Sequence, residues 1–200
     1  MLITTARLHA RPRETAQRVP LPRRGRPLSK RVSHMSTEKT LENLFHDTLK
    51  DIYYAERKIL KALPKMARAA QSDKLKQAFE THREETEGQI ERLQQVFELF
   101  GKPPRGKTCD AIEGIIAEGE EIMEEFKGNP ALDAGLIAAA QAVEHYEIAR
   151  YGTLKRWAKE LGMTEAAKLI DQTLQEESKT DDGLTQLAET SVNKHAMAAA

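Results

Sequence analysis

Apolar residues recur every three or four positions along most of the chain after residue 36, which is the spacing of amphipathic helices. Gly101, Gly128 and Gly162 lie where three of these patterns stop, as is typical of helix ends. Pro64 lies inside the first pattern, and we expect it to kink that helix or to split off its last turns. The spacing predicts four long helices and a shorter one, over about residues 37–70, 73–100, 110–126, 131–161 and 164–193.

The order of these helices predicts an all-α fold. Tight connections near residues 71–73 and at Gly162 make each neighbouring pair of long helices an antiparallel hairpin. Nearly thirty residues separate the two hairpins, which is enough to carry the chain along the length of a bundle. This connectivity is typical of ferritin-like four-helix bundles, and it places the short fifth helix in the crossover.

Acidic side chains interrupt the apolar stripe near the middle of every long helix. Steps of three and four along each helix put them on the face that carries the core residues. A buried carboxylate is costly unless it is neutralised, paired or bound to a metal. Four glutamates lie on the stripes, Glu56, Glu85, Glu144 and Glu177, and His82, Glu147 and Asp181 accompany them.

The four glutamates also fall at matching heights. Glu56 and Glu85 are equally far from the first tight turn, and Glu144 and Glu177 are equally far from the second. Since a helix rises ~1.5 Å per residue, each pair should face its partner some ~20 Å from its turn. Oxygen ligands with one histidine suit iron or manganese. The sequence therefore predicts a dimetal site, with the seven residues above as candidate ligands.

A metal-free interpretation stays open. In it, the buried acids form a hydrogen-bonded network that has a structural role. Tyr53 and Tyr151 are placed to hydrogen-bond the glutamates under either interpretation. Four arginines could pair with the acids: Arg57, Arg83, Arg92 and Arg150.

Residues 1–34 differ from the rest of the chain. They hold eight Arg and one Lys against Glu14 alone, a net charge of +8 that leaves −8 for residues 35–200. They also show no helical periodicity, and they offer too little apolar surface to offset the entropy of ordering. We interpret 1–34 as a disordered basic extension and 35–200 as the ferritin-like domain. A misassigned start, a basic arm that contacts nucleic acid or membrane, and an organellar transit peptide are three open explanations of the extension.

The acidic domain argues against nucleic acid as a partner of the folded part. No apolar run approaches the ~20 residues needed to span a bilayer, so we expect no membrane partner. The lone Cys109 excludes an intrachain disulfide and favours a cytoplasmic location.

Three segments carry a resemblance to a known family: 49–56 (LKDIYYAE), 84–93 (EETEGQIERL) and 139–148 (AAQAVEHYEI). They resemble the YciE/YciF-like family of ferritin-like bacterial stress proteins, and the match extends from about Ser36 to the C-terminus. The resemblance implies a five-helix ferritin-like fold, a homodimer and a role in the stress response.

Ferritin-like dimetal proteins take one glutamate from each of two helices and a Glu-x-x-His pair from each of the other two. On that scheme Glu56 and Glu144 are the single glutamates, and Glu177 is the glutamate of the fourth-helix pair. This chain departs from the scheme twice. Thr180 replaces the histidine expected after Glu177, with Asp181 as the nearest substitute, and the second helix has the reversed order, His82 before Glu85.

The function expected from the sequence is that of a stress protein with a dimetal-carboxylate site, in which Glu147 is an additional ligand. The metal pair would be iron or manganese, and it would react with peroxide or oxygen. The alternative is a metal-free structural or interaction protein with a buried polar network.

Overall fold

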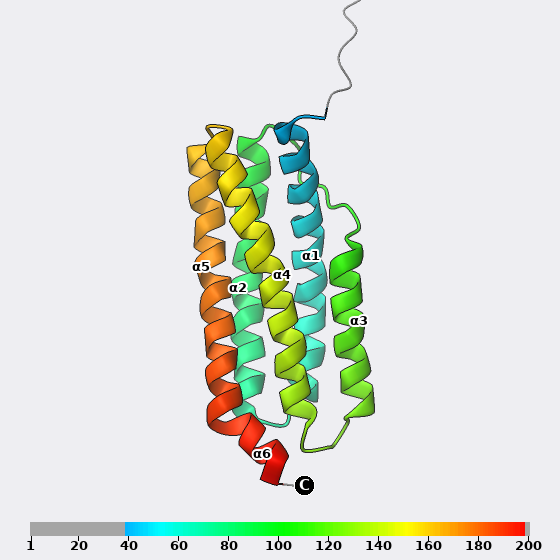
Figure 1. Cartoon of the computed structure of the whole chain (residues 1–200). Helices are drawn as coiled ribbons and strands as arrows, with labels where there is room; N and C mark the ends of the chain where they lie inside the picture. Colours follow the sequence, from blue (N-terminus) through cyan, green and yellow to red (C-terminus); the bar gives the residue numbers. More distant parts are fainter. Residues whose placement is uncertain (1–38, 199–200) are drawn as a thin grey trace, which may run out of the picture. The chain divides into compact units, whose positions relative to one another are not determined.

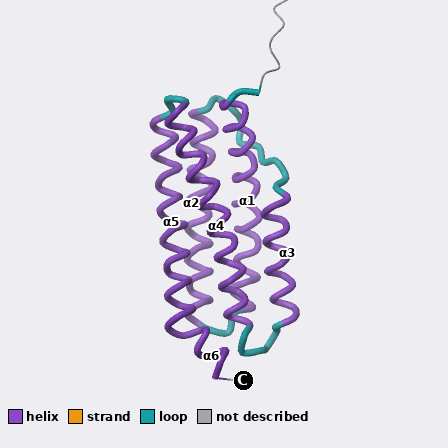
Figure 2. Tube along the Cα trace, in the orientation of Figure 1, coloured by secondary structure: helices purple, strands orange, loops and turns teal. Residues whose placement is uncertain are grey.

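The computed structural model describes residues 39–198. The basic extension expected at residues 1–34 lies outside the described residues. The described part of the chain is helical throughout and contains no strand (Figures 1 and 2). Its elements are α1 (Leu41–Ala69), α2 (Asp73–Leu99), α3 (Asp110–Glu125), α4 (Leu132–Glu160), α5 (Thr164–Leu187), the π-helical turn η1 (Ala188–Val192) and α6 (Asn193–Ala198).

The long helices form two antiparallel hairpins, α1 with α2 and α4 with α5. The hairpins pack together through α1 against α4 and through α2 against α5. The shorter α3 lies along the outside of α1 and α4 within the crossover (Figure 1). The predicted ferritin-like four-helix bundle with a fifth helix in the crossover is confirmed.

Local sequence explains where the helices begin and end. Thr40 caps α1, because its side chain accepts the Asn43 N–H at 3.3 Å while the Asn43 side chain accepts the Thr40 N–H at 3.0 Å. Gly101 and Gly162 follow α2 and α4 with φ of 70° and 73°, a backbone conformation that glycine adopts without strain.

Two details of the predicted helices were wrong. Helix α1 continues through Pro64 to Ala69, so its last turns are not split off; buried residues on both sides of the proline, Leu63 and Met66, hold these turns against the core. The other possibility, a kink at Pro64, stays a prediction. The last helix was predicted to fade near Asn193, whereas helical structure continues through η1 and α6 to Ala198. Val192 is buried in η1 and anchors this continuation. No helix of the described part is sufficiently long and apolar to cross a membrane.

The turn between α1 and α2 is fixed by the start of α4. The buried Asp133 carboxylate accepts the backbone N–H groups of Gln71 and Ser72, both at 2.7 Å. Hydrogen bonds to a charged group are stronger than neutral ones. Asp133 therefore ties the two hairpins together at one end of the bundle, some distance from the acidic residues of the stripes.

Replacing Asp133 with alanine should lower the free energy of unfolding by about 2–3 kcal/mol, because two backbone N–H groups lose a charged acceptor. Urea unfolding of the metal-free protein measures this change. Asp182→Ala is the matched control, since Asp182 lies exposed on α5. Equal losses in the two variants would contradict the role assigned to Asp133.

Candidate metal centre

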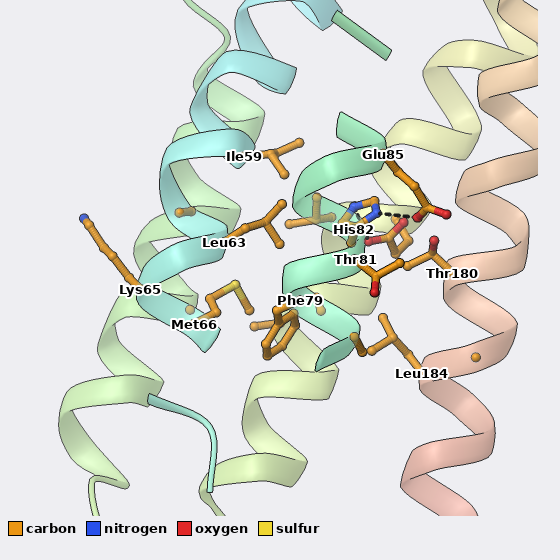
Figure 3. A pocket seen from close by; sticks show the side chains of 18 of the residues that line it. Ile59, Leu63, Lys65, Met66, Phe79, Thr81, His82, Glu85, Thr180 and Leu184 are labelled. Carbon is orange, nitrogen blue, oxygen red and sulfur yellow. Dashed lines mark ion pairs between the residues drawn. The ribbon is translucent and has the colours of Figure 1, made fainter. Parts of the chain in front are cut away.

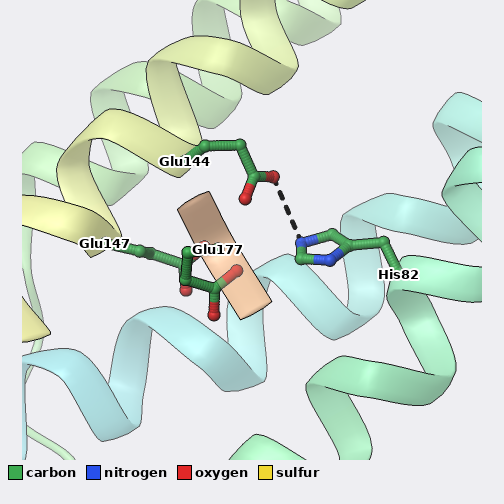
Figure 4. Close-up of side chains that lie close together, drawn as sticks. All are labelled: His82, Glu144, Glu147 and Glu177. Carbon is green, nitrogen blue, oxygen red and sulfur yellow. Dashed lines mark ion pairs between the residues drawn. The ribbon is translucent and has the colours of Figure 1, made fainter. Parts of the chain in front are cut away.

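Four buried side chains converge at mid-height in the bundle. His82 comes from α2, Glu144 and Glu147 from α4, and Glu177 from α5 (Figure 4). Each offers one ligand atom, and these atoms lie within 4.8 Å of one another. None of the four residues is more than 3% exposed. Glu144 and Glu177, which the residue count predicts at the same height in their hairpin, thus lie close together in the structure.

Most polar atoms of this cluster lack a hydrogen-bond partner. Both oxygens of Glu147, both of Glu177 and Oε2 of Glu144 are buried and unpaired. His82 Nε2 lies 3.2 Å from Glu144 Oε1, an ion-pair distance without hydrogen-bond geometry. Native proteins rarely leave so many buried polar atoms unsatisfied in one place. Convergent unpaired oxygens with one nitrogen donor fit the ligand set of a divalent metal.

Glu56 of α1 lies beside these four residues, near enough for its charge to act on Glu147, but it is not among the residues whose ligand atoms lie within 4.8 Å of one another. It is fully buried, one of its oxygens accepts a hydrogen bond from the Tyr151 hydroxyl, and Oε2 has no partner. The hydrogen bond that the sequence allowed for Tyr151 is therefore present. Tyr53 instead accepts a hydrogen bond from Gln94 at 3.3 Å and does not reach the acids.

Burial and mutual repulsion favour protonated carboxyls in this cluster. Burial raises the pKa of Glu56 to about 7 despite the opposing hydrogen bond from Tyr151. Burial, together with the charges of neighbouring glutamates, raises the pKa of both Glu147 and Glu177 well above the ordinary value. Burial alone would lower the pKa of His82, but the facing carboxylates of Glu144 and Glu85 raise it well above its usual range.

Three of the seven predicted ligands are not among the four residues of the cluster: Glu56, which lies beside it, Glu85 and Asp181. Glu85 is 32% exposed and approaches the far nitrogen of His82, with Oε2 at 3.7 Å from Nδ1 (Figure 3). Asp181 accepts a hydrogen bond from Gln141 at 3.0 Å and lies 3.3 Å from His145 Nε2. The buried stripe of α2 passes through His82, Thr86 and Gln89, which leaves Glu85 at its edge.

Among the described residues, none of the four arginines considered as partners pairs with a buried glutamate of the cluster. Arg92 instead forms an ion pair with Glu176 and donates to Thr173 at 3.0 Å. Gln89 also donates a hydrogen bond to Glu176, at 3.2 Å. The polar contacts of Gln89 and Arg92 with α5 were not predicted, although both residues interrupt the apolar pattern of α2. The other three lie over aromatic rings or on the surface: Arg57 on Tyr53, Arg150 on Tyr146, and Arg83 near Glu87.

The fold and the buried acids define a ferritin-like helical protein with a carboxylate-lined centre. Residues 40–197 match the family described as "Domain of unknown function (DUF892)", and the chain belongs to this family. It is 52% identical to protein YciF of Escherichia coli K12 over 160 residues, which cover 79% of this chain and 96% of YciF. The resemblance to the YciE/YciF-like proteins is thereby confirmed.

Solved structures agree with this assignment. The crystal structure of YciF, described as an E. coli stress protein, is 51% identical with a TM-score of 0.75, over 78% of this chain and 99% of that one. YcfI of Rhodopseudomonas palustris, for which a structural role has been suggested, is 47% identical with a TM-score of 0.72, over 76% and 96% of the two chains. A Xanthomonas campestris protein that is 24% identical shares the fold, with a TM-score of 0.61 over 80% of this chain and 98% of that one.

The metal-free protein should become less stable as the pH rises from about 5 to about 8. A pKa that is raised on folding, as for Glu56, Glu147, Glu177 and His82, means that the folded state holds protons which the unfolded chain releases. This stability is lost as the pH passes through the raised pKa. Glu56 alone, with a pKa of about 7 against 4.5, accounts for a loss on the order of 3 kcal/mol.

Urea unfolding in the presence of a chelator, repeated across this pH range, measures the effect. Glu56→Gln removes one of the titrating groups and should flatten the profile. A free energy of unfolding that rises with pH would show that the cluster does not hold protons in the folded state.

Proposed function

We propose that this protein binds a pair of divalent metal ions, iron or manganese, between the two hairpins. The ligands would be Glu56, His82, Glu144, Glu147 and Glu177. The observation that carries the proposal is the set of six buried carboxylate oxygens, contributed by four glutamates, that have no hydrogen-bond partner. Two divalent cations would neutralise these glutamates and remove their mutual repulsion.

The surrounding residues support this assignment. Glu85 approaches the nitrogen of His82 that faces away from Glu144, where an acceptor orients a ligating imidazole. Tyr151 is fully buried, and burial and the nearby glutamates raise its pKa, so that it keeps its proton and holds Glu56 in place. Asp181 is engaged with Gln141 and His145, and the proposal leaves it out of the ligand set.

A bound metal pair would supply Lewis acidity and, with iron or manganese, electrons for reaction with oxygen or peroxide. The chain's part is to hold the ligands rigidly on four helices and to keep bulk water away from them, since the ligands are almost fully buried. We propose a stress-response role for the protein, in keeping with the description of YciF as a stress protein. A cytoplasmic location is proposed from the sequence alone.

Metal binding is tested by loading the purified protein with Fe(II) or Mn(II) under anaerobic conditions. We expect two ions per chain and a melting temperature that rises with the logarithm of the free metal concentration, because only the folded state forms the site. Elemental analysis and calorimetry give these two quantities. Less than one ion per chain, with no gain in stability, would remove the support for a metal site.

Glu147→Gln separates the metal site from a metal-free polar network. Both oxygens of Glu147 are unpaired and face other acids, so a neutral amide should abolish metal stabilisation and leave the metal-free protein equally stable or more stable. In a structural network the same change should cost about 1–3 kcal/mol without metal. Glu144 is less suitable, because it also faces His82. Glu118→Gln, on the exposed face of α3, is the control.

We also propose that the protein forms a homodimer. Leu41 and Leu44 at the start of α1 are 36% and 50% exposed, and Leu99 at the end of the antiparallel α2 is 53% exposed. All three leucines lie at the same end of the α1–α2 hairpin, and their exposed apolar surface favours association with a second copy of the chain. Sedimentation at tens of micromolar should give twice the chain mass, and Leu44→Glu should shift the protein to monomer. A wild-type monomer at that concentration would contradict the proposal.

A further inference from the structure

An apolar cavity of about 370 Å³ adjoins the acidic cluster inside the bundle (Figure 3). Side chains of all five helices α1–α5 line it, including Ile59 and Leu63 from α1, Phe79 from α2 and Leu184 from α5. On α2 its lining ends at His82 and Glu85, and on α4 it ends at Glu144. One end of the cavity therefore touches the cluster, and the rest extends toward the α1–α2 turn.

Small side chains create this space. Cavities of about 300–1,000 Å³ with mainly apolar walls and a few polar groups are typical of ligand-binding sites. Six residues of the lining are glycine or alanine: Ala62, Ala78, Gly119, Ala139, Ala140 and Gly183.

Unpaired polar atoms lie at the inner end of the cavity. His82 and Glu144 are only 3% and 2% exposed, yet neither nitrogen of His82 has a hydrogen-bond partner, and neither does Oε2 of Glu144. Both side chains belong to the cavity lining. A ligand headgroup that donates one hydrogen bond and accepts another would satisfy these atoms.

We propose that the cavity binds an unbranched aliphatic molecule with one uncharged hydroxyl-type headgroup, as in a primary alcohol or an alkyl hydroperoxide. The hydroxyl donates to Glu144 and accepts from His82, and the chain lies between Leu63, Phe79 and Leu184. A carboxylate headgroup would face the buried glutamates of the cluster and would be repelled by them. This inference goes beyond the proposed metal site, because the aliphatic molecule is expected to bind in the cavity of the metal-free protein.

The probes are linear primary alcohols from 1-butanol to 1-decanol, titrated by calorimetry into the metal-free protein with a chelator present. Affinity should rise roughly fourfold with each added methylene, as for a buried chain, and should stop rising once the cavity is filled. Octanoate should bind at least tenfold more weakly than 1-octanol, because its carboxylate would face the buried glutamates. Binding that does not depend on chain length, or that is equal for 1-octanol and octanoate, would overturn the proposal.

Two variants fill the cavity while keeping the helices intact. A side chain at Gly119 starts 3.4 Å from the Ala139 Cβ, which is ordinary contact, and one at Gly183 meets nothing within 4 Å. Gly119→Leu and Gly183→Leu should each weaken 1-octanol binding at least tenfold. Leucine is also a better helix former than glycine, so both variants should fold, as circular dichroism would verify.

Gly114→Leu is the matched control. It lies on the same helix as Gly119, has open space around it and is absent from the cavity lining. It should bind 1-octanol as the wild type does, and equal weakening in the control would overturn the proposal. A second copy of the chain could cover the cavity instead. In that case no alcohol will bind, and Gly119→Leu and Gly183→Leu will change the dimer dissociation constant. This result would also overturn the proposal. All of these measurements are made on the metal-free protein, so their failure is distinct from a failure of the proposed metal site.

Discussion

Burial of like charges at one level of the bundle is the constraint on which the rest of this structure depends. Glu56, Glu144, Glu147 and Glu177 are each at most 2% exposed. In a low-dielectric interior, such groups stay together only if protons, cations or hydrogen-bond donors compensate them. Tyr151 and His82 supply part of this compensation, and six carboxylate oxygens are left unpaired. The polar centre therefore costs stability that the apolar core above and below it must offset.

Contacts outside the centre hold the helices in place. Asp133 fixes the α1–α2 turn to the start of α4 through two backbone N–H groups. On the outer side, Glu113 of α3 accepts the Tyr54 hydroxyl and lies 2.7 Å from Lys58, so α3 is attached to α1. A shift of one helix by a single residue would move its ligand by ~1.5 Å and rotate it by about 100°. These contacts therefore maintain the geometry of the cluster without touching it.

From the sequence, the height of the acidic cluster in the bundle could be predicted more accurately than the set of residues that form it. Helix rise is constant, so the heights of Glu144 and Glu177 followed from counting residues to a turn. His82 and Glu85 lie three residues apart, about 60° around the helix axis, and packing of α2 against its neighbours decided that His82 faces inward. Asp133 was missed because an acid in the first turn of a helix is also common on the surface, where it favours the helix dipole. The cavity was missed because no single helix shows it.

The two halves of the bundle on either side of the centre are built differently. Between the centre and the start of α1, aromatic rings fill the core, with Phe45 against Phe100 at 5.4 Å and Tyr53 against Phe97 at 5.5 Å between ring centroids. Toward the α1–α2 turn, alanine and glycine leave the cavity instead. A polar centre needed only for structure would be equally well placed with both halves densely packed. The asymmetry places His82 and Glu144 at the end of a cavity on one side of the centre, while the other side is closed by aromatic packing.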